Sequence, residues 1–207
     1  MVRGKFITLE GGEGVGKTTN LEFIKDHLLQ YKIPVVITRE PGGTYLAEKI
    51  RHLLLDADSE EISEQAELLL MFAARAQHIK HVIEPALARG NWVLCDRFTD
   101  ATYAYQGGGR NMKASTIEWL ENLVQGPLRP DLTLLLDAPV EIGIDRARKR
   151  GAFDRFETEK TGFFERVRRA YLLQLELHPE RIKLIKANQP LIDVQRAIVD
   201  ALRVLLR

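Results

Sequence analysis

The stretch Gly11–Thr18, GGEGVGKT, decides the fold of this 207-residue chain. It fits the pattern G-x-x-x-x-G-K-[ST] at every fixed position, with the apolar run Phe6–Leu9 before it and apolar residues at helical spacing after it. The glycines of such a loop let successive backbone N–H groups turn toward an anion, and the N-terminus of the following helix adds its dipole. The sequence therefore predicts a nucleotide phosphate loop, in which Lys17 reaches the β- and γ-phosphates and Thr18 binds Mg²⁺.

Outward from this loop, short apolar runs alternate with longer stretches of helical periodicity. The expected strands are Phe6–Leu9, Val35–Thr38, Trp92–Cys95, Leu132–Leu136 and Ile182–Ile185. The expected helices are at about Thr18–Gln30, Tyr45–Leu55, Glu64–Arg89, Thr116–Val124, Val140–Arg150, Phe163–His178 and Leu191–Leu206. Continuous apolar strands are typical of a sheet covered on both faces. The alternation predicts an α/β fold with a doubly wound, five-stranded parallel sheet flanked by helices.

Two glycine-containing stretches interrupt the alternation. Gln106–Asn111 (QGGGRN) has three consecutive glycines, and Gly151–Gly162 is charged and bounded by glycines. Both have the composition of mobile loops, which in such folds usually border the site. The alternative for each is a plain connector, which the glycine triplet taken alone favours.

The composition excludes several classes of function. The chain has 30 Lys+Arg against 29 Asp+Glu, a net charge of +1, which argues against a general nucleic-acid or anionic-membrane binder. Its one cysteine cannot form an intrachain disulfide, and no apolar run approaches the roughly 20 residues that span a bilayer. We expect one globular domain over residues 1–207, located in the cytoplasm, with no nucleic-acid or membrane partner.

A phosphate loop alone does not separate a GTPase, a motor and a small kinase. The guanine-reading N-K-x-D and the switch D-x-x-G of GTPases are absent from the sequence, and motors need more chain than 207 residues. A compact phosphotransferase remains.

Further polar motifs follow the next two predicted strands, where open α/β sheets bind ligands. They are Arg39–Thr44 (REPGGT) and Asp96–Phe98 (DRF), which runs on to AYQGGGR. Arg75 lies in the apolar helical stretch LLLMFAARAQ, and ARKRGAFDRFE follows later. This ordered set, over essentially the whole chain, resembles thymidylate kinase, a family of nucleoside monophosphate kinases with a P-loop fold.

The resemblance implies phosphoryl transfer from Mg²⁺-bound ATP to dTMP, and a homodimer that uses a helix from the Glu64–Arg89 region. It also implies roles for individual residues. The ATP-binding set is Gly11, Gly12, Glu13, Gly14, Val15, Gly16, Lys17 and Thr18, with Arg146 and Arg148. The dTMP-binding set is Glu10, Glu40, Arg51, Phe72, Arg75, Arg97, Thr102, Tyr105 and Gln106. The metal set is Thr18, Glu10 and Asp96, and the catalytic set is Lys17, Arg97, Arg150 and Glu10.

Within these sets, Arg51 and Arg97 are expected to hold the acceptor phosphate, a role suited to planar bidentate donors. Arg75, Thr102 and Gln106 are expected to read thymine, with Tyr105 against the sugar. Phe72 is expected to stack on the base, with Met71 as the alternative, because both precede Arg75 at helical spacing.

The segment 146–160 resembles the lid of the family, which supplies arginines that the phosphate loop lacks. We expect Arg150 to act as the arginine finger, with Arg155 as an alternative. Outside these sets, Asp137 is either a metal-binding carboxylate or a helix cap, and His78 is expected at the surface or an interface.

Other readings of the sequence stay open. One is another pyrimidine nucleotide or deoxynucleoside kinase; Arg51 and Arg97 argue against a nucleoside acceptor, which has no phosphate for them. The second is a regulatory module that binds ATP without turnover. A nucleic-acid binder is the third, and the near-neutral charge argues against it.

Overall fold

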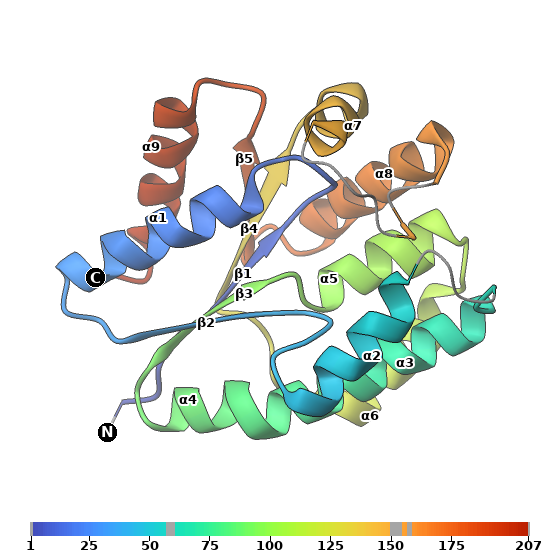
Figure 1. The fold of residues 1–207 in the computed structure, drawn as a ribbon. Helices are drawn as coiled ribbons and strands as arrows, with labels where there is room; N and C mark the ends of the chain where they lie inside the picture. Colours follow the sequence, from blue (N-terminus) through green and yellow to red (C-terminus); the bar gives the residue numbers. More distant parts are fainter. Residues whose placement is uncertain (1, 57–60, 150–154, 157–158, 207) are drawn as a thin grey trace.

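The structure is a computed structural model that describes residues 2–56, 61–149, 155–156 and 159–206. Five parallel strands form one sheet in the order β2-β3-β1-β4-β5 (Figure 1). The strands are β1 (Phe6–Glu10), β2 (Val35–Arg39), β3 (Trp92–Asp96), β4 (Leu132–Asp137) and β5 (Ile182–Lys186). The predicted doubly wound sheet is confirmed. Each strand begins where it was expected and continues one residue further, and that last residue is charged in every case.

Helices cover both faces of the sheet. On one face, α1 (Lys17–Gln30) and α9 (Leu191–Leu202) pack Ile24 and Ile198 against Ile7 and Leu9 of β1. On the other face, Phe6 of β1 belongs to a separate cluster with residues of β3 and the helices that precede it. Because neighbouring β1 side chains alternate between the two buried clusters, the strand is apolar along its length, as the uninterrupted pattern predicted.

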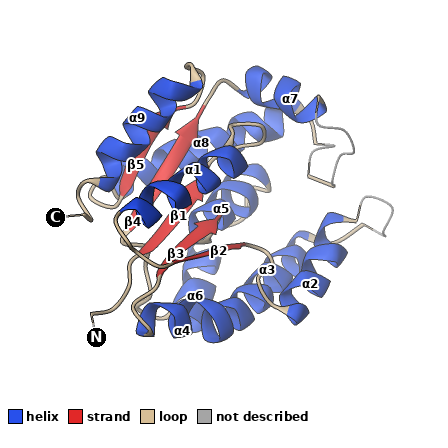
Figure 2. Cartoon of the chain, turned by 60° about the vertical axis from the view of Figure 1, so that its left-hand side comes forward, coloured by secondary structure: helices blue, strands red, loops and turns tan. Residues whose placement is uncertain are grey.

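The remaining helices lie mostly on the second face and at the β2 end of the sheet (Figure 2). They are α2 (Tyr45–Leu55), α3 (Glu64–His78), η1 (Ile79–Ile83), α4 (Glu84–Ala88), α5 (Thr99–Thr102), η2 (Tyr103–Gly109), α6 (Ala114–Gln125), α7 (Val140–Arg148) and α8 (Thr161–Leu177). The predicted helix Glu64–Arg89 is formed by α3, η1 and α4 in succession. Its π-helical section precedes Pro85, which lacks the N–H that an α-helix would use. The last predicted helix is shorter than expected, since α9 ends at Leu202.

The prediction of a loop at Gln106–Asn111 was wrong for its first four residues. Residues 106–109 lie in the π-helix η2, which packs against α8. A methyl group on Gly108 would lie 2.6 Å from the Ala170 Cβ, and one on Gly109 would lie 2.4 Å from the Phe163 ring. These two glycines permit the close approach of two helical segments, so here they favour packing rather than an open loop. The other predicted loop is described only in part: Thr161 and Gly162 open α8, while 151–154 and 157–158 lie outside the described residues.

Candidate active site

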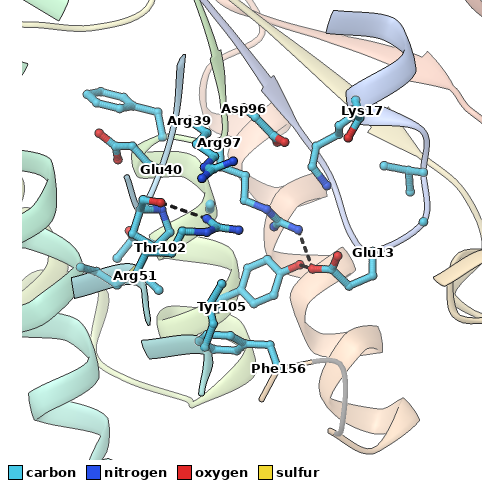
Figure 3. Close-up of a pocket in the computed structure, with 18 of the residues that line it drawn as sticks. Glu13, Lys17, Arg39, Glu40, Arg51, Asp96, Arg97, Thr102, Tyr105 and Phe156 are labelled. Atoms are coloured by element: carbon cyan, nitrogen blue, oxygen red, sulfur yellow. Dashed lines mark hydrogen bonds and ion pairs between the residues drawn. The ribbon is translucent and has the colours of Figure 1, made fainter. Parts of the chain in front are cut away.

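A cavity of about 410 Å³ lies between the phosphate loop and the carboxyl ends of β2 and β3 (Figure 3). Its wall contains these predicted site residues: Glu13, Gly14, Val15, Gly16, Lys17, Thr18, Glu40, Arg51, Arg75, Asp96, Arg97, Thr102, Tyr105, Gln106 and Arg146. Residues that were not predicted also line it, among them Arg39, Pro41 and Phe156. The parallel sheet explains the convergence, because the carboxyl ends of its strands meet at one edge.

The phosphate loop is held in its turn by glycines with positive φ. Gly11, Gly14 and Gly16 have φ of 136°, 66° and 90°, values that side chains with a Cβ rarely adopt. A methyl group on Gly14 would also lie 2.0 Å from the Gly143 carbonyl oxygen of α7. Gly11 and Gly12 carry the loop but do not line the main cavity.

Lys17 opens α1 and is nearly buried, at 8% exposed. Its Nζ donates to the carbonyl oxygens of Gly11 at 3.2 Å and Gly12 at 3.0 Å. Burial, and then the positive charge of Arg97, lower the pKa of Lys17. The ammonium therefore lies at the loop in surroundings that disfavour its charge, and a bound anion would stabilise the charged form.

Arg97 connects the carboxyl end of β3 to the phosphate loop across the cavity. Its Nη2 donates to Glu13 Oε1 at 2.5 Å, and the Tyr105 hydroxyl donates to the same oxygen at 2.7 Å (Figure 3). The guanidinium carbon lies 4.6 Å from the centroid of the Tyr105 ring. Arg97 itself has a φ of 68°, an uncommon value that turns the chain sharply at the end of β3. The contact with Glu13 was not predicted, and no local pattern in the sequence pairs the two motifs.

Arg75 is held rigidly in the wall of the cavity, only 2% exposed. Its Nε donates to Glu40 Oε2 at 2.7 Å and its Nη2 donates to Thr102 Oγ1 at 3.0 Å. Its Nη1 is buried and has no hydrogen-bond partner within the described chain. A buried donor without a partner is costly, so this nitrogen is suited to an acceptor on a ligand. Gln106 is also buried, and its Nε2 donates to Glu67 Oε1 at 2.8 Å.

The choice of Phe72 over Met71 does not agree with the structure. Met71 lines the cavity, whereas Phe72 packs into a core cluster with Leu68 and residues of α6. Adjacent positions on a helix point about 100° apart, so only one of the two can face the cavity. The Phe72 ring lies instead behind Arg75, 4.7 Å from the guanidinium carbon.

Glu10 also lies elsewhere than expected, since it does not line the cavity. It is fully buried at the end of β1, where it accepts from the Phe98 backbone N–H at 2.7 Å and from the Tyr171 hydroxyl at 2.9 Å. Burial, and then the nearby Asp100 carboxylate, raise the pKa of Glu10 to about 8. The strand pattern could not show that α8 covers this carboxyl group.

The raised pKa makes Glu10 a source of pH-dependent instability. Between its usual value of 4.5 and about 8, the folded protein holds a proton that the unfolded chain has released, so rising pH favours unfolding. Glu10→Gln does not titrate and can still accept from Phe98. We expect the variant to be more resistant to urea than the parent at pH 8, with the difference shrinking toward pH 5. Urea unfolding midpoints at pH 5, 6.5 and 8 test this, and parallel curves for the two proteins would contradict it.

The lid segment is described in part. Arg146 on α7 lines the cavity and donates through Nη1 to the Ala187 carbonyl oxygen at 3.1 Å, while Arg148 is exposed and does not line it. Arg155 donates to the Leu54 carbonyl oxygen at 2.9 Å and to Glu67 at 2.5 Å. Arg150, the expected finger, lies outside the described residues.

The residues present fit a magnesium ion that is held mainly by a nucleotide. Thr18 and Asp96 both line the cavity, and Asp96 Oδ1 is buried without a hydrogen-bond partner in the described residues. Those same residues contain no cluster of three or more His, Cys, Asp or Glu side chains that could bind a metal alone. Mg²⁺ characteristically uses one or two protein oxygens plus phosphates and water. Asp137 is engaged differently, in a two-bond ion pair with Arg168 at 2.7 and 2.9 Å.

A phosphate loop on a doubly wound parallel sheet, facing an arginine-lined cavity, defines the class of P-loop nucleoside monophosphate kinases. The family model described as thymidylate kinase matches residues 9–198. The chain belongs to the thymidylate kinase family.

Individual relatives agree with this assignment. The chain is 61% identical to the thymidylate kinase of Pseudomonas entomophila (strain L48) and 58% identical to that of Ectopseudomonas mendocina (strain ymp), each over 96% of this chain and 94% of the relative. A crystal structure of thymidylate kinase from Ehrlichia chaffeensis superposes with a TM-score of 0.78 at 32% identity, covering 98% of this chain and 99% of that one.

Proposed function

We infer that this protein is a dTMP kinase, which transfers the γ-phosphoryl group of ATP to dTMP and releases dTDP and ADP. The observation that carries the assignment is the pairing, in one cavity, of Lys17 in the phosphate loop with the buried Nη1 of Arg75, which has no hydrogen-bond partner among the described residues. The first suits a nucleoside triphosphate and the second suits a carbonyl oxygen of a base. Membership of the thymidylate kinase family supports the same activity.

On the donor side, we propose that the backbone N–H groups of Gly11–Thr18 and the Lys17 ammonium hold the ATP phosphates. Lys17 would exchange its two carbonyl contacts for phosphate oxygens. Thr18, with Asp96 directly or through water, would hold Mg²⁺, which neutralises charge on the transferring group. Glu10 is fully buried and does not line the cavity, so it would act on the metal only through other residues.

On the acceptor side, Arg51 and Arg97 would hold the dTMP phosphate in line with the γ-phosphoryl group. Arg51 donates one N–H to the Pro41 carbonyl oxygen at 2.9 Å, which fixes the head of the side chain at the cavity wall. Phosphoryl transfer needs positioning and charge neutralisation more than covalent help. Two fixed guanidinium groups provide both.

Base recognition would use Arg75, Thr102 and Gln106, with Met71 rather than Phe72 in van der Waals contact with thymine and Tyr105 beside the sugar. All of these except Phe72 line the cavity. A site of fixed polar groups discriminates strongly, because a wrong base leaves a buried donor unpaired.

Arg146 and the segment that follows it would close over ATP, with Arg150 as the proposed arginine finger.

Residues 1–207 would act as one domain, in the cytoplasm. No helix in the described ranges is both long enough and apolar enough to cross a bilayer.

We also propose that the active form is a homodimer. Helices α2, α3 and α6 form one group (Figure 2). Large apolar side chains on these helices stay exposed. They include Leu53 (58% exposed), Leu69 (58%), Trp119 (64%) and Leu123 (65%). A second copy would remove this apolar surface from water. Sedimentation equilibrium of the purified chain should give the mass of two chains, and a monomer at micromolar concentration would contradict the proposal.

Coupled ADP release with Mg²⁺, ATP and a panel of dTMP, dUMP, UMP, dCMP and AMP tests the proposed function. We expect dTMP to have the highest kcat/KM. A preference for another monophosphate would support the kinase activity but contradict the proposed recognition of thymine. Bound ATP with no turnover on any acceptor would favour the regulatory module instead.

A further inference from the structure

Behind Arg75 lies a polar side chain that the proposed reaction does not use. His78 ends α3, one helical turn after Arg75. It was expected at the surface or an interface, but it is completely buried within the chain (0% exposed). Its Nδ1 is 2.9 Å from Glu40 Oε1, and its Nε2 is 2.6 Å from Thr38 Oγ1. His78 does not line the cavity, so any effect on the substrate passes through its partners.

Glu40 connects His78 to Arg75. One carboxylate oxygen, Oε1, faces His78, and the other, Oε2, accepts from Arg75 Nε at 2.7 Å. Arg75 in turn donates to Thr102. The contacts form a continuous buried path from Thr38 at the end of β2 to the wall of the acceptor cavity.

The proton positions along this path follow from the charge of Glu40. Burial would raise the pKa of Glu40, but Arg75 and His78 lower it below its usual value, so the carboxylate is ionised. An ionised carboxylate can only accept hydrogen bonds, which places a hydrogen on His78 Nδ1. In the neutral ring, Nε2 then accepts from the Thr38 hydroxyl. Both ring nitrogens and both Glu40 oxygens are satisfied, which leaves little rotational freedom to either side chain.

The ring is also confined sterically. A methyl group on Gly43 would lie 2.5 Å from His78 Cδ2 and 2.7 Å from Thr38 Oγ1. The REPGGT loop therefore packs directly on the imidazole, and the ring cannot move away from Glu40 without displacing backbone.

We propose that His78 is a positioning residue for base recognition, which orients the Arg75 guanidinium through Glu40 so that Nη1 faces the pyrimidine of the acceptor. This rests on the proposed role of Arg75 in reading thymine. Without the His78 hydrogen bond, Glu40 can turn and Arg75 turns with it. The affinity for dTMP and the discrimination against dCMP both fall, because cytosine presents a donor where thymine presents an acceptor.

Two substitutions separate positioning from packing. In His78→Asn the amide nitrogen takes the place of Nδ1 and can still donate to Glu40, whereas in His78→Gln the amide extends toward the former Nε2 and Thr38. We expect His78→Gln to raise the KM for dTMP about tenfold and to lower the dTMP-to-dCMP ratio of kcat/KM about tenfold, the effect of one hydrogen bond to a charged group. His78→Asn should stay within about threefold of the parent in both quantities, and the KM for ATP should not change in either variant.

A purely structural role predicts the opposite order, because Asn removes more buried volume than Gln. An unchanged dTMP-to-dCMP ratio in a folded His78→Gln variant would overturn the proposal. If His78→Gln does not fold, Thr38→Val removes only the outer partner of the ring; an increase of about threefold in the KM for dTMP is expected, and no increase would overturn the proposal.

Arg75→Ala distinguishes this proposal from the function on which it rests. We expect Arg75→Ala alone to lower kcat/KM for dTMP, and His78→Gln to have no further effect in that background. If Arg75→Ala leaves kcat/KM for dTMP unchanged, the proposal that Arg75 recognises thymine is wrong. If Arg75→Ala lowers kcat/KM for dTMP but a folded His78→Gln variant does not, only the proposed positioning role of His78 is wrong.

Discussion

Replacing Lys17 with methionine should lower kcat by about 10²- to 10³-fold, the usual cost of removing one preorganised donor from a developing anion. The Lys17 ammonium already lies at the loop, held by the carbonyl oxygens of Gly11 and Gly12. Methionine keeps the apolar stem and removes the ammonium group with its charge and its N–H donors. Since burial disfavours the charged form of Lys17, folding should not suffer, and the thermal unfolding midpoint should not fall.

Steady-state kcat at saturating ATP and dTMP measures this prediction. Lys25→Met is the matched control, because Lys25 is on the same helix and forms an ion pair with Glu22 away from the cavity. The control should turn over as fast as the parent. Full activity of a folded Lys17→Met variant would mean that the loop does not hold the transferring phosphates.

Arg97→Lys should lower kcat/KM for dTMP by about 10²-fold, a loss typical of truncating one partner of a buried charge pair. The planar guanidinium contacts Glu13 and lies against the Tyr105 ring while it faces the cavity. A lysine ammonium is a point charge without the second donor arm, so it cannot hold the phosphate and Glu13 together. The KM for dTMP should rise more than the KM for ATP, because the donor arm that lysine lacks is the one proposed to hold the acceptor phosphate.

Kinetics with varied dTMP at saturating ATP test this substitution. Arg89→Lys, at an exposed arginine that caps α4, is the control and should match the parent. If Arg97→Lys instead raises the KM for ATP and leaves that for dTMP unchanged, Arg97 belongs to the donor side and the assignment is wrong.

The sequence predicted the architecture because its signals are local. The phosphate loop, with fixed glycine spacing, implies a strand before it and a helix after it, and the apolar runs located all five strands at their first residue. Arg75, Arg97 and Thr102 were predicted from motifs and do line one cavity.

What could not be predicted depends on contacts between distant segments. The burial of Glu10 is completed by Tyr171, 161 positions away, and no pattern near Glu10 reports that contact. Met71 lies four residues and Phe72 three residues before Arg75, so helical spacing favours both positions equally. Only the packing of α6 against α3 decides that Phe72 is the buried one. The three glycines of η2 gave this segment the composition of a loop. Two of them, Gly108 and Gly109, instead lack a Cβ where η2 packs closely against α8.

The contact between Gly14 and Gly143 limits how this sequence can change over time. A side chain on Gly143 would lie 2.3 Å from the Glu13 carbonyl oxygen, and one on Gly14 would meet Gly143 from the other direction. Gly143 cannot gain a methyl group unless the Glu13 backbone withdraws, and Gly14 cannot gain one unless the Gly143 backbone withdraws. Glu13 in turn holds Arg97. Substitutions at Gly143 on α7 are therefore constrained by the part of the cavity that Arg97 lines. Even an exchange of Gly143 for alanine, far along the chain from the phosphate loop, is excluded from the evolution of this sequence by one backbone contact.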